Sequence, residues 1–135
     1  MQHPKISIII AVLNRKQHLQ KAIESVINQD FTDYELIIVD GKSTDGTLDI
    51  IRKYESKISY WESSKDKNVY DAMNKAIAKS NGDWLYFLGA DDEICKTTFQ
   101  NIFANNLEEC YLVFGNIKYQ NNQQFVGSFN NKLFF

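Results

Sequence analysis

The sequence contains few of the residues that mark specialised protein classes. Its 135 residues include one proline, six glycines and two cysteines, and no Gly/Ser-rich or low-complexity linker divides them. The hydrophobic fraction of 44% and the charged fraction of 24% are those of an ordinary globular domain, which excludes a disordered chain, a collagen and a coiled coil. The length favours one domain over two.

An excess of charge of one sign is also missing. Fifteen Lys and Arg residues face seventeen Asp and Glu residues, which gives a formal net charge of -2, and no block of like charge interrupts the chain. A nucleic-acid-binding protein needs a basic patch or stripe, so we expect no nucleic-acid partner.

The two cysteines, Cys95 and Cys110, are separated by fourteen residues and have no CxxC or His-rich spacing. They therefore do not form a zinc motif, and we expect two buried, reduced thiols. The N-terminus has no signal-peptide pattern and its apolar run is too short for a membrane helix. We expect a cytoplasmic protein; contact of the apolar end, residues 125–135, with a partner or the inner face of the membrane stays open.

Two β-branched apolar runs, residues 5–12 and 34–40, predict strands covered on both faces, as in a parallel sheet. A helix is predicted between them, with Asn14 as its N-cap and Gln17 in a capping-box position. Its apolar stripe consists of Leu19, Ala22, Ile23, Val26 and Ile27.

The rest of the chain continues this alternation. We predict helices near 47–55 and 97–105, strands near 58–61 and 83–89, and a helix after the N-cap Asn68 that ends near Asn81-Gly82 with a left-handed C-cap. The third helix carries Val69, Ala72, Met73, Ala76 and Ile77 on one face, and strand 83–89 reads as buried. Residues 111–119 and 123–129 flank a turn and predict an antiparallel hairpin. The fold expected is α/β, mostly parallel, with flanking helices.

Polar residues follow three of these strands. Asn14 and Arg15 follow the first, Asp40 and "GKSTDGT" the second, and Asp91 and Asp92 the strand at 83–89. Ligands of open α/β sheets bind at the carboxyl ends of strands. No phosphate loop of the GxxxxGK[ST] or GxGxxG type follows the first strand, which weakens the readings as a P-loop, dinucleotide-binding or nucleotidyltransferase-like protein.

Each of these acidic positions has two interpretations. Asp91 and Asp92 can hold Mg²⁺ or Mn²⁺, or they form a solvated turn before a helix. Asp40 can accept hydrogen bonds from a nucleobase or a ribose, or it only ends the strand. Asp71 can line a ligand site, or it only satisfies backbone donors at the start of a helix. Lys67 and Lys75 can balance a diphosphate, whereas His3 and His18 read as surface residues.

In order, the segments "SIIIAVLNR", "YELIIVDGKSTDGT" and "DKNVYDAMNKAIAKSNGDWLYFLGADD" resemble the family 2 glycosyltransferases, which have the Rossmann-like GT-A nucleotide-sugar-binding fold. The resemblance runs from about residue 5 to about residue 119. The third segment is similar to the subgroup that builds bacterial surface polysaccharides. It implies that a Mn or Mg cation binds at Asp91 and Asp92. The nucleotide-sugar-binding residues that it implies are Ala11, Val12, Asn14, Asp40, Asp66, Asp71, Asn74 and Asp91.

The resemblance also implies an activity. A sugar would pass with inversion from a nucleoside-diphosphate sugar, preferably a UDP-sugar, to a hydroxyl of a saccharide or lipid-linked acceptor. Relatives often have Asp or Asn where this chain has Gly89, so its metal site has fewer side chains. Relatives are also longer, and Glu93, Glu108 and Glu109 offer no convincing general base.

We therefore expect residues 1–135 to form one donor-binding domain that lacks the acceptor-binding C-terminal part. The alternative is a catalytically incomplete nucleotide-sugar-binding module. The sequence does not indicate an oligomeric state.

Overall fold

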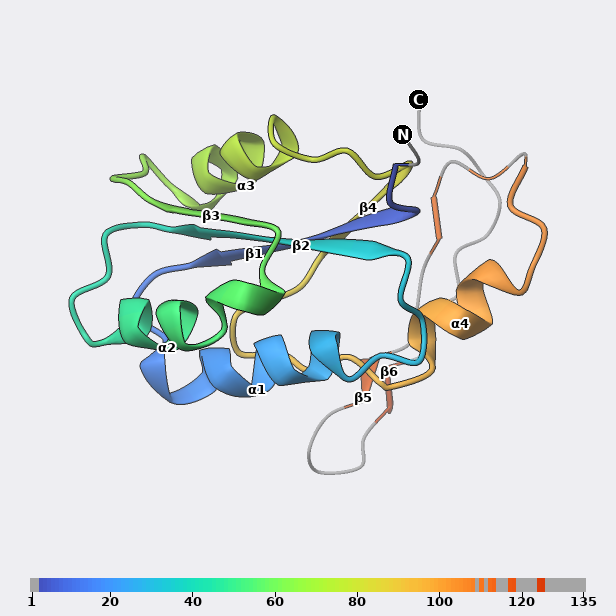
Figure 1. Ribbon diagram of the computed structural model, residues 1–135, viewed down its shortest axis with the longest axis horizontal. Coiled ribbons are helices and arrows are strands. Elements are labelled where there is room, and N and C mark those ends of the chain that lie inside the picture. The colour runs from blue at the N-terminus through green and yellow to red at the C-terminus, as the bar shows by residue number, and fades with distance from the viewer. Residues whose placement is uncertain (1–2, 109, 111, 114–116, 119–123, 126–135) are drawn as a thin grey trace. The chain divides into compact units, whose positions relative to one another are not determined.

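A computed structural model describes residues 3–108, 110, 112–113, 117–118 and 124–125 (Figure 1). The chain divides into two compact units, residues 1–104 and 105–135. The first unit contains the parallel sheet, its helices and every predicted site residue.

The sheet of the first unit has four parallel strands in the order β3-β2-β1-β4. The strands are β1 (Ile6–Val12), β2 (Tyr34–Asp40), β3 (Tyr60–Ser63) and β4 (Trp84–Phe87). Because β1 and β2 pair in parallel with Val12 opposite Asp40, both strands end at the same edge of the sheet. The predicted α/β fold is confirmed, and the polar strand ends lie together as expected.

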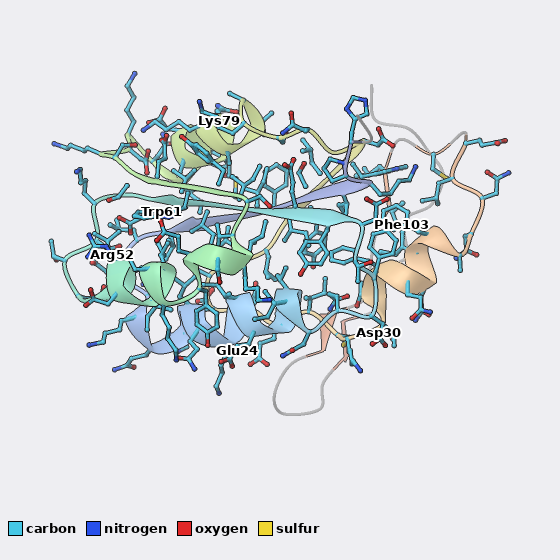
Figure 2. All side chains as sticks on the ribbon, viewed as in Figure 1. Glu24, Asp30, Arg52, Trp61, Lys79 and Phe103 are labelled. Atoms are coloured by element: carbon cyan, nitrogen blue, oxygen red, sulfur yellow. The ribbon has the colours of Figure 1, made fainter. Side chains whose placement is uncertain are left out.

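Helices cover both faces of this sheet (Figure 1). Helix α1 (Lys16–Ile27) and helix α2 (Thr47–Lys53) lie on one face, and α3 (Val69–Ile77) lies on the other. A single turn, η1 (Glu55–Lys57), follows α2, and α4 (Thr98–Phe103) ends the unit. Figure 2 shows Glu24 of α1 and Lys79, just past α3, on opposite sides of the sheet.

The larger core joins β1 to α1, α2 and the segment that leads into α4. Leu19, Ile23 and Phe99 are completely buried in it. The alternate residues of β1 that belong to the same core are Ile6, Ile8, Ile10 and Val12. A smaller core under α3 contains Ile9, Ile37, Val39, Ala72 and Ala76. Alternate residues of β1 and β2 thus feed two cores, which explains why these strands are apolar at nearly every position.

Strand β4 is less buried than its sequence predicts. Trp84 and Tyr86 pack against the larger core, but Leu85 and Phe87 are 41% and 43% exposed. Among the described residues β4 pairs only with β1, and α3 packs over β1 and β2. Val69 and Ile77 of α3 are exposed, so the predicted apolar face of this helix is only partly buried.

Two predicted helix caps are wrong. Asn14 does not cap α1, because Arg15 is the N-cap residue and the Asn14 backbone is left-handed, with φ 51°. Helix α3 ends at Ile77 without a left-handed glycine. Gly82 instead lies against β1, where an added Cβ would come within 2.5 Å of the Ser7 backbone nitrogen. The Asn68 cap of α3 is confirmed, since its side chain accepts a hydrogen bond from the Asp71 amide at 3.0 Å.

Both cysteines are free, but the prediction that they are buried is wrong, because Cys95 and Cys110 are exposed. Cys95 lies in the loop between β4 and α4, where the inward position is taken by Ile94. His3 and His18 are exposed, as predicted.

The second unit contains one described strand pair. Strand β5 (Ile117–Lys118) is antiparallel to β6 (Gln124–Phe125). The connection between them, Glu109 and the apolar end from residue 126 onward lie outside the described residues, so the predicted hairpin and the predicted role of the end stay predictions. Within the described part of the chain, no helix has the length and apolar character needed to cross a membrane.

Candidate functional site

The loops after β1 and β2 are joined by hydrogen bonds that hold Asn14 in place. Its amide N–H donates to Ser43 Oγ at 2.8 Å, and its side-chain oxygen accepts from the Thr44 amide at 2.9 Å. The Gly41 amide donates to the Val12 carbonyl at 2.9 Å. The predicted residues Val12 and Asn14 thus lie directly beside the loop that follows Asp40.

The start of α1 is capped from this second loop. Asp45 Oδ2 accepts from the Lys16 amide at 3.0 Å, and Thr47 Oγ1 accepts from the Arg15 amide at 3.0 Å. The hydrogen bond from the Thr47 hydroxyl, followed by that from the Lys16 amide, lowers the pKa of Asp45. Sequence reasoning did not assign Asp45 and Thr47 to this position, since the helix they cap begins about thirty residues earlier in the chain. Their clustering in "GKSTDGT" is the only sequence signal for it.

Asp40 is completely buried and organises the loop that follows it. Its Oδ2 accepts from the amides of Lys42 and Ser43, both at 3.1 Å, and from the Ser63 hydroxyl at 2.6 Å. Its other oxygen, Oδ1, has no hydrogen-bond partner among the described residues. A buried acceptor left without a donor costs about 1–3 kcal/mol, so this oxygen suits a ligand that brings a donor. The strand-ending role considered for Asp40 is therefore real, but it leaves one carboxylate oxygen without a partner among the described residues.

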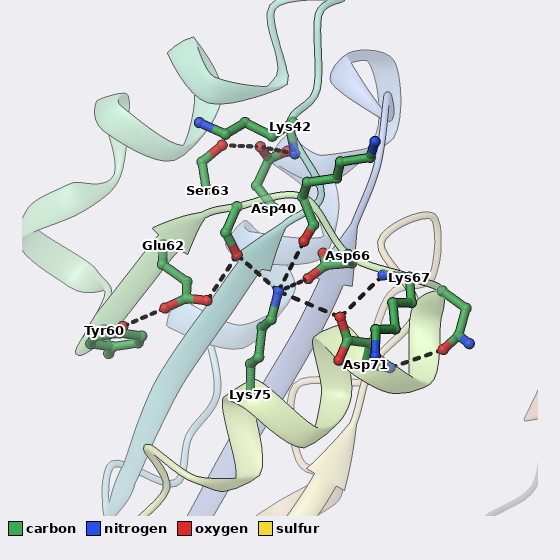
Figure 3. A network of polar contacts seen from close by, with 12 residues as sticks. Asp40, Lys42, Tyr60, Glu62, Ser63, Asp66, Lys67, Asp71 and Lys75 are labelled. Atoms are coloured by element: carbon green, nitrogen blue, oxygen red, sulfur yellow. Dashed lines mark hydrogen bonds and ion pairs between the residues drawn. The ribbon is translucent and has the colours of Figure 1, made fainter.

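Asp66 and Asp71 are connected through Lys75 (Figure 3). The Lys75 ammonium group donates to Asp66 Oδ1 and lies 3.5 Å from Asp71 Oδ2. Asp71 Oδ2 also accepts from the Lys67 amide at 3.1 Å, which is the largest cause of its lowered pKa. The hydrogen bond with Asp66 is the largest cause of the raised pKa of Lys75.

Gly41, the residue after β2, lies close to the Asp66 carboxylate of this network. A Cβ added to Gly41 would lie 3.2 Å from Asp66 Oδ2 and 3.5 Å from Leu13 Cδ1. The missing side chain therefore allows the loops after β1, β2 and β3 to meet. Leu13 is 54% exposed, so it forms an apolar rim at this point.

Two predicted site residues take less part in these contacts. Ala11 is half-buried in β1 and packs against the smaller core. Asn74 is exposed on α3.

Asp91 and Asp92 follow β4, and their carboxylates approach the same point. A Cβ built on Gly89 would overlap Asp92 Oδ2 and lie 3.4 Å from Asp91 Oδ1. Arg15 extends from the β1 end of the sheet to place its Nε 3.9 Å from Asp91 Oδ2. Sequence reasoning placed Arg15 at this edge but did not predict the ion pair.

The chemistry of this pair fits a divalent cation that is shared with a ligand. No group of three or more His, Cys, Asp or Glu side chains converges in the described ranges, so the described residues offer two carboxylates here. Mg²⁺ and Mn²⁺ are commonly held by one or two carboxylates together with waters and substrate phosphates. A cation site here therefore depends on a phosphate-bearing ligand.

Two curated relatives are similar to this chain in sequence. The chain is 37% identical over 123 residues to a PGL/p-HBAD biosynthesis glycosyltransferase of Mycobacterium bovis, covering 87% of this chain and 48% of the relative. It is 32% identical over 117 residues to the GalNAc(5)-diNAcBac-PP-undecaprenol beta-1,3-glucosyltransferase of Campylobacter jejuni, covering 84% of this chain and 38% of the relative. The chain thus spans about half the length of these relatives, or less.

Solved structures are similar in fold. Staphylococcus aureus TarS 1–349 in complex with UDP-GlcNAc aligns with a TM-score of 0.70 and 28% identity, over 74% of this chain and 30% of that chain. A mannosyltransferase from Pyrobaculum calidifontis in complex with GDP-Man and Mn²⁺ aligns with a TM-score of 0.68 and 20% identity, over 76% of this chain and 32% of that chain. The second likeness bears on the fold alone.

The family model described as glycosyl transferase family 2 matches residues 7–132, which include every residue of the site. Together with the relatives and the GT-A arrangement of the sheet, this match shows that the chain belongs to glycosyltransferase family 2.

Proposed function

We propose that this chain is the donor-binding part of a metal-dependent, inverting glycosyltransferase of polysaccharide biosynthesis. Its donor is a nucleoside-diphosphate sugar, and a UDP-sugar is the preferred candidate. The observation that carries the proposal is the buried Asp40 Oδ1, which has no partner among the described residues and lies at the strand edge where ligands of such sheets bind.

The nucleoside is assigned to the loops around Gly41. Asp40 and Asp66 each have one carboxylate oxygen that no described hydrogen bond occupies, Oδ1 and Oδ2. Carboxylate oxygens accept hydrogen bonds from a nucleobase imide or ribose hydroxyls. Uracil has a single imide N–H, and a structural relative with 28% identity was solved with UDP-GlcNAc, which supports a uridine nucleotide.

The diphosphate is assigned to the edge at β4. Asp91 and Asp92 would hold a Mn or Mg cation there, and Arg15 stands beside Asp91 as a second positive group. A bound cation would neutralise charge on the departing diphosphate. Asn14, Val12 and Ala11 would form the floor between the nucleoside and the diphosphate, and Asn74 and Asp71 the wall on α3.

The acceptor would be a saccharide or a lipid-linked saccharide, and its hydroxyl would attack the anomeric carbon from the face opposite the diphosphate. We propose one donor-binding domain over residues 1–135, since the family match runs across both units. A cytoplasmic location, with contact at the inner face of the membrane, remains part of this proposal.

Calorimetry of the 135-residue chain with UDP and UDP-GlcNAc, each with and without Mn²⁺, tests the proposal. We expect binding that strengthens with Mn²⁺ and is weakened at least about tenfold in the Asp91→Ala/Asp92→Ala variant. Asp30→Ala serves as a matched control, because Asp30 pairs with Lys96 away from the strand ends. Absence of binding with Mn²⁺ present, or equal binding by the double variant, contradicts the proposal.

A second measurement separates an enzyme from a nucleotide-sugar-binding module. The chain spans about half of its relatives or less, so binding of a donor and its turnover are measured separately for it. Release of UDP from UDP-GlcNAc by this chain alone, abolished in the Asp91→Ala/Asp92→Ala variant, would exclude the module. Metal-dependent binding without turnover would support it.

A further inference from the structure

The ammonium group of Lys75 is surrounded by four oxygen atoms (Figure 3). It donates to Asp66 Oδ1, to Ser64 Oγ at 3.0 Å and to the Lys65 carbonyl at 3.2 Å, and Asp71 Oδ2 lies 3.5 Å away. An ammonium group has three N–H donors, and three hydrogen bonds to the loop before α3 use all of them. Lys75 therefore has no N–H donor left for the diphosphate whose charge the sequence suggested it could balance.

The contact with Lys75 determines the direction of the Asp66 carboxylate. The Asp66 side chain is only 8% exposed, and its Oδ1 is held by the ammonium group. Its Oδ2 lies 3.2 Å from the position of a Cβ on Gly41, so it faces the loop that follows Asp40. Because Oδ1 and Oδ2 belong to one planar carboxylate, the hydrogen bond between Lys75 and Oδ1 also fixes the direction of Oδ2.

The charge of Lys75 also holds two carboxylates on one side of α3. Asp66 and Asp71 both approach the same ammonium group, and like charges so placed repel each other when the cation between them is removed. Because Asp66 belongs to a loop and Asp71 to a helix, the loop is the part that would move.

We propose that Lys75 is a positioning residue for the nucleoside: it turns Asp66 Oδ2 toward Gly41 and the loop that follows Asp40, and does not itself bind phosphate. This inference rests on the proposed function, since it assigns Asp66 to the nucleoside. It predicts that the charge of Lys75 matters for ligands that carry no phosphate at all.

Uridine and UDP are the two probes that distinguish positioning from phosphate binding. We expect Lys75→Met to weaken the binding of uridine and the binding of UDP by the same factor, about tenfold, because the defect lies at the nucleoside. If Lys75 bound phosphate, Lys75→Met would weaken the binding of UDP and leave the binding of uridine unchanged, and that result overturns the inference. Dissociation constants come from ligand-observed NMR for uridine and from calorimetry with Mn²⁺ for UDP.

Three further variants complete the test. Lys79→Met is the matched control, because Lys79 follows the same helix but lies over the Tyr60 ring, 5.3 Å from its centroid. We expect it to bind both ligands as the wild type does. Lys75→Arg retains the charge and is expected to recover part of the uridine affinity.

If Lys75→Met fails to fold, which circular dichroism reports, the uridine and UDP affinities of Lys75→Arg are compared in its place. Asp66→Asn is expected to lose uridine affinity to the same extent as Lys75→Met, and the substitution at Lys75 added to it should cause no further loss. Additive losses in the double variant would overturn the inference. Failure of the wild type to bind UDP with Mn²⁺ would instead reject the proposed function, whereas wild-type binding with an unaffected Lys75→Met variant rejects this inference alone.

Discussion

The carboxylate of Asp92 lies over Gly89, in the space that a side chain at position 89 would occupy. The Asp92 amide also donates to the Gly89 carbonyl at 3.0 Å, so the turn folds the second aspartate back toward the end of β4. The glycine that looked like a weakening of the metal motif therefore makes room for one of its carboxylates.

Gly89→Ala is expected to displace the Asp92 carboxylate and to weaken Mn²⁺-dependent UDP binding by roughly 10–100-fold. Gly89 does not have a positive φ, so alanine adds no backbone strain and the thermal midpoint should change little. Calorimetry with UDP and a Mn²⁺ titration measures the first effect and thermal melting the second. Unchanged affinity for Mn²⁺ would show that Asp92 does not act at the cation.

Gly82→Ala is expected to do the opposite, lowering stability with little effect on UDP affinity. Its Cβ would lie 2.5 Å from the Ser7 nitrogen and 2.7 Å from the Ile6 carbonyl carbon, and backbone atoms of a central strand cannot move aside. Overpacking of this kind costs typically about 1–3 kcal/mol. Urea unfolding measures the free energy, with Gly89→Ala as the comparison. A stability equal to that of the wild type would contradict the close packing of Gly82 against β1.

Phe99→Ala is expected to destabilise the first unit by about 3–5 kcal/mol. Phe99 is completely buried, and its ring meets those of Phe31 at 6.5 Å and Tyr86 at 5.3 Å between centroids. Chemical denaturation gives the value, and Phe103→Ala, which removes a half-buried ring, should cost less. A loss below about 1 kcal/mol would mean that the segment after Asp92 does not pack on the core.

The stabilising effect of Asp71 should disappear in acid. Its pKa is lowered in the folded protein, first by the Lys67 amide, from an ordinary value of about 3.8. The unfolded chain therefore binds the proton more readily, so the stabilisation is complete above that value and is lost as pH falls through the lower folded pKa. The difference in thermal midpoint between wild type and Asp71→Asn should thus shrink below pH 4. A difference that is constant between pH 7 and pH 3 would contradict this assignment.

The alternation of apolar runs and amphipathic stripes predicted the fold because burial on both faces of β1 and β2 depends on local periodicity. The same reasoning placed Asp40, Asp91 and Asp92 at one edge, since parallel strands end together. Buried Leu19 and Ile23 agree with the predicted stripe of the first helix. Helix α2 and strand β3 were predicted with ends shifted by about two residues, because a 3-10 turn intervenes at Glu55–Lys57.

Predictions from local sequence were wrong where a segment distant in the chain supplies the hydrogen-bond or packing partner. Asn14 has a side chain suited to capping, but Asp45 and Thr47 take the first amides of α1 and leave Asn14 to bond Thr44. The exposure of Leu85 and Phe87 likewise depends on which strands α3 covers. Neither outcome has a signal in the neighbouring residues.

The sequence by itself determined the order of the strands and helices, the family and the acidic residues at the strand ends, because these follow from periodicity and from motifs in fixed order. Only the tertiary structure decided how the carboxylates are used. Asp71 and Lys75 form an i,i+4 pair that spacing can predict, but the contact of Lys75 with Asp66 joins a loop to a helix. Likewise, folding leaves Asp40 Oδ1 buried without a partner in the described residues, since burial depends on all the segments that meet there.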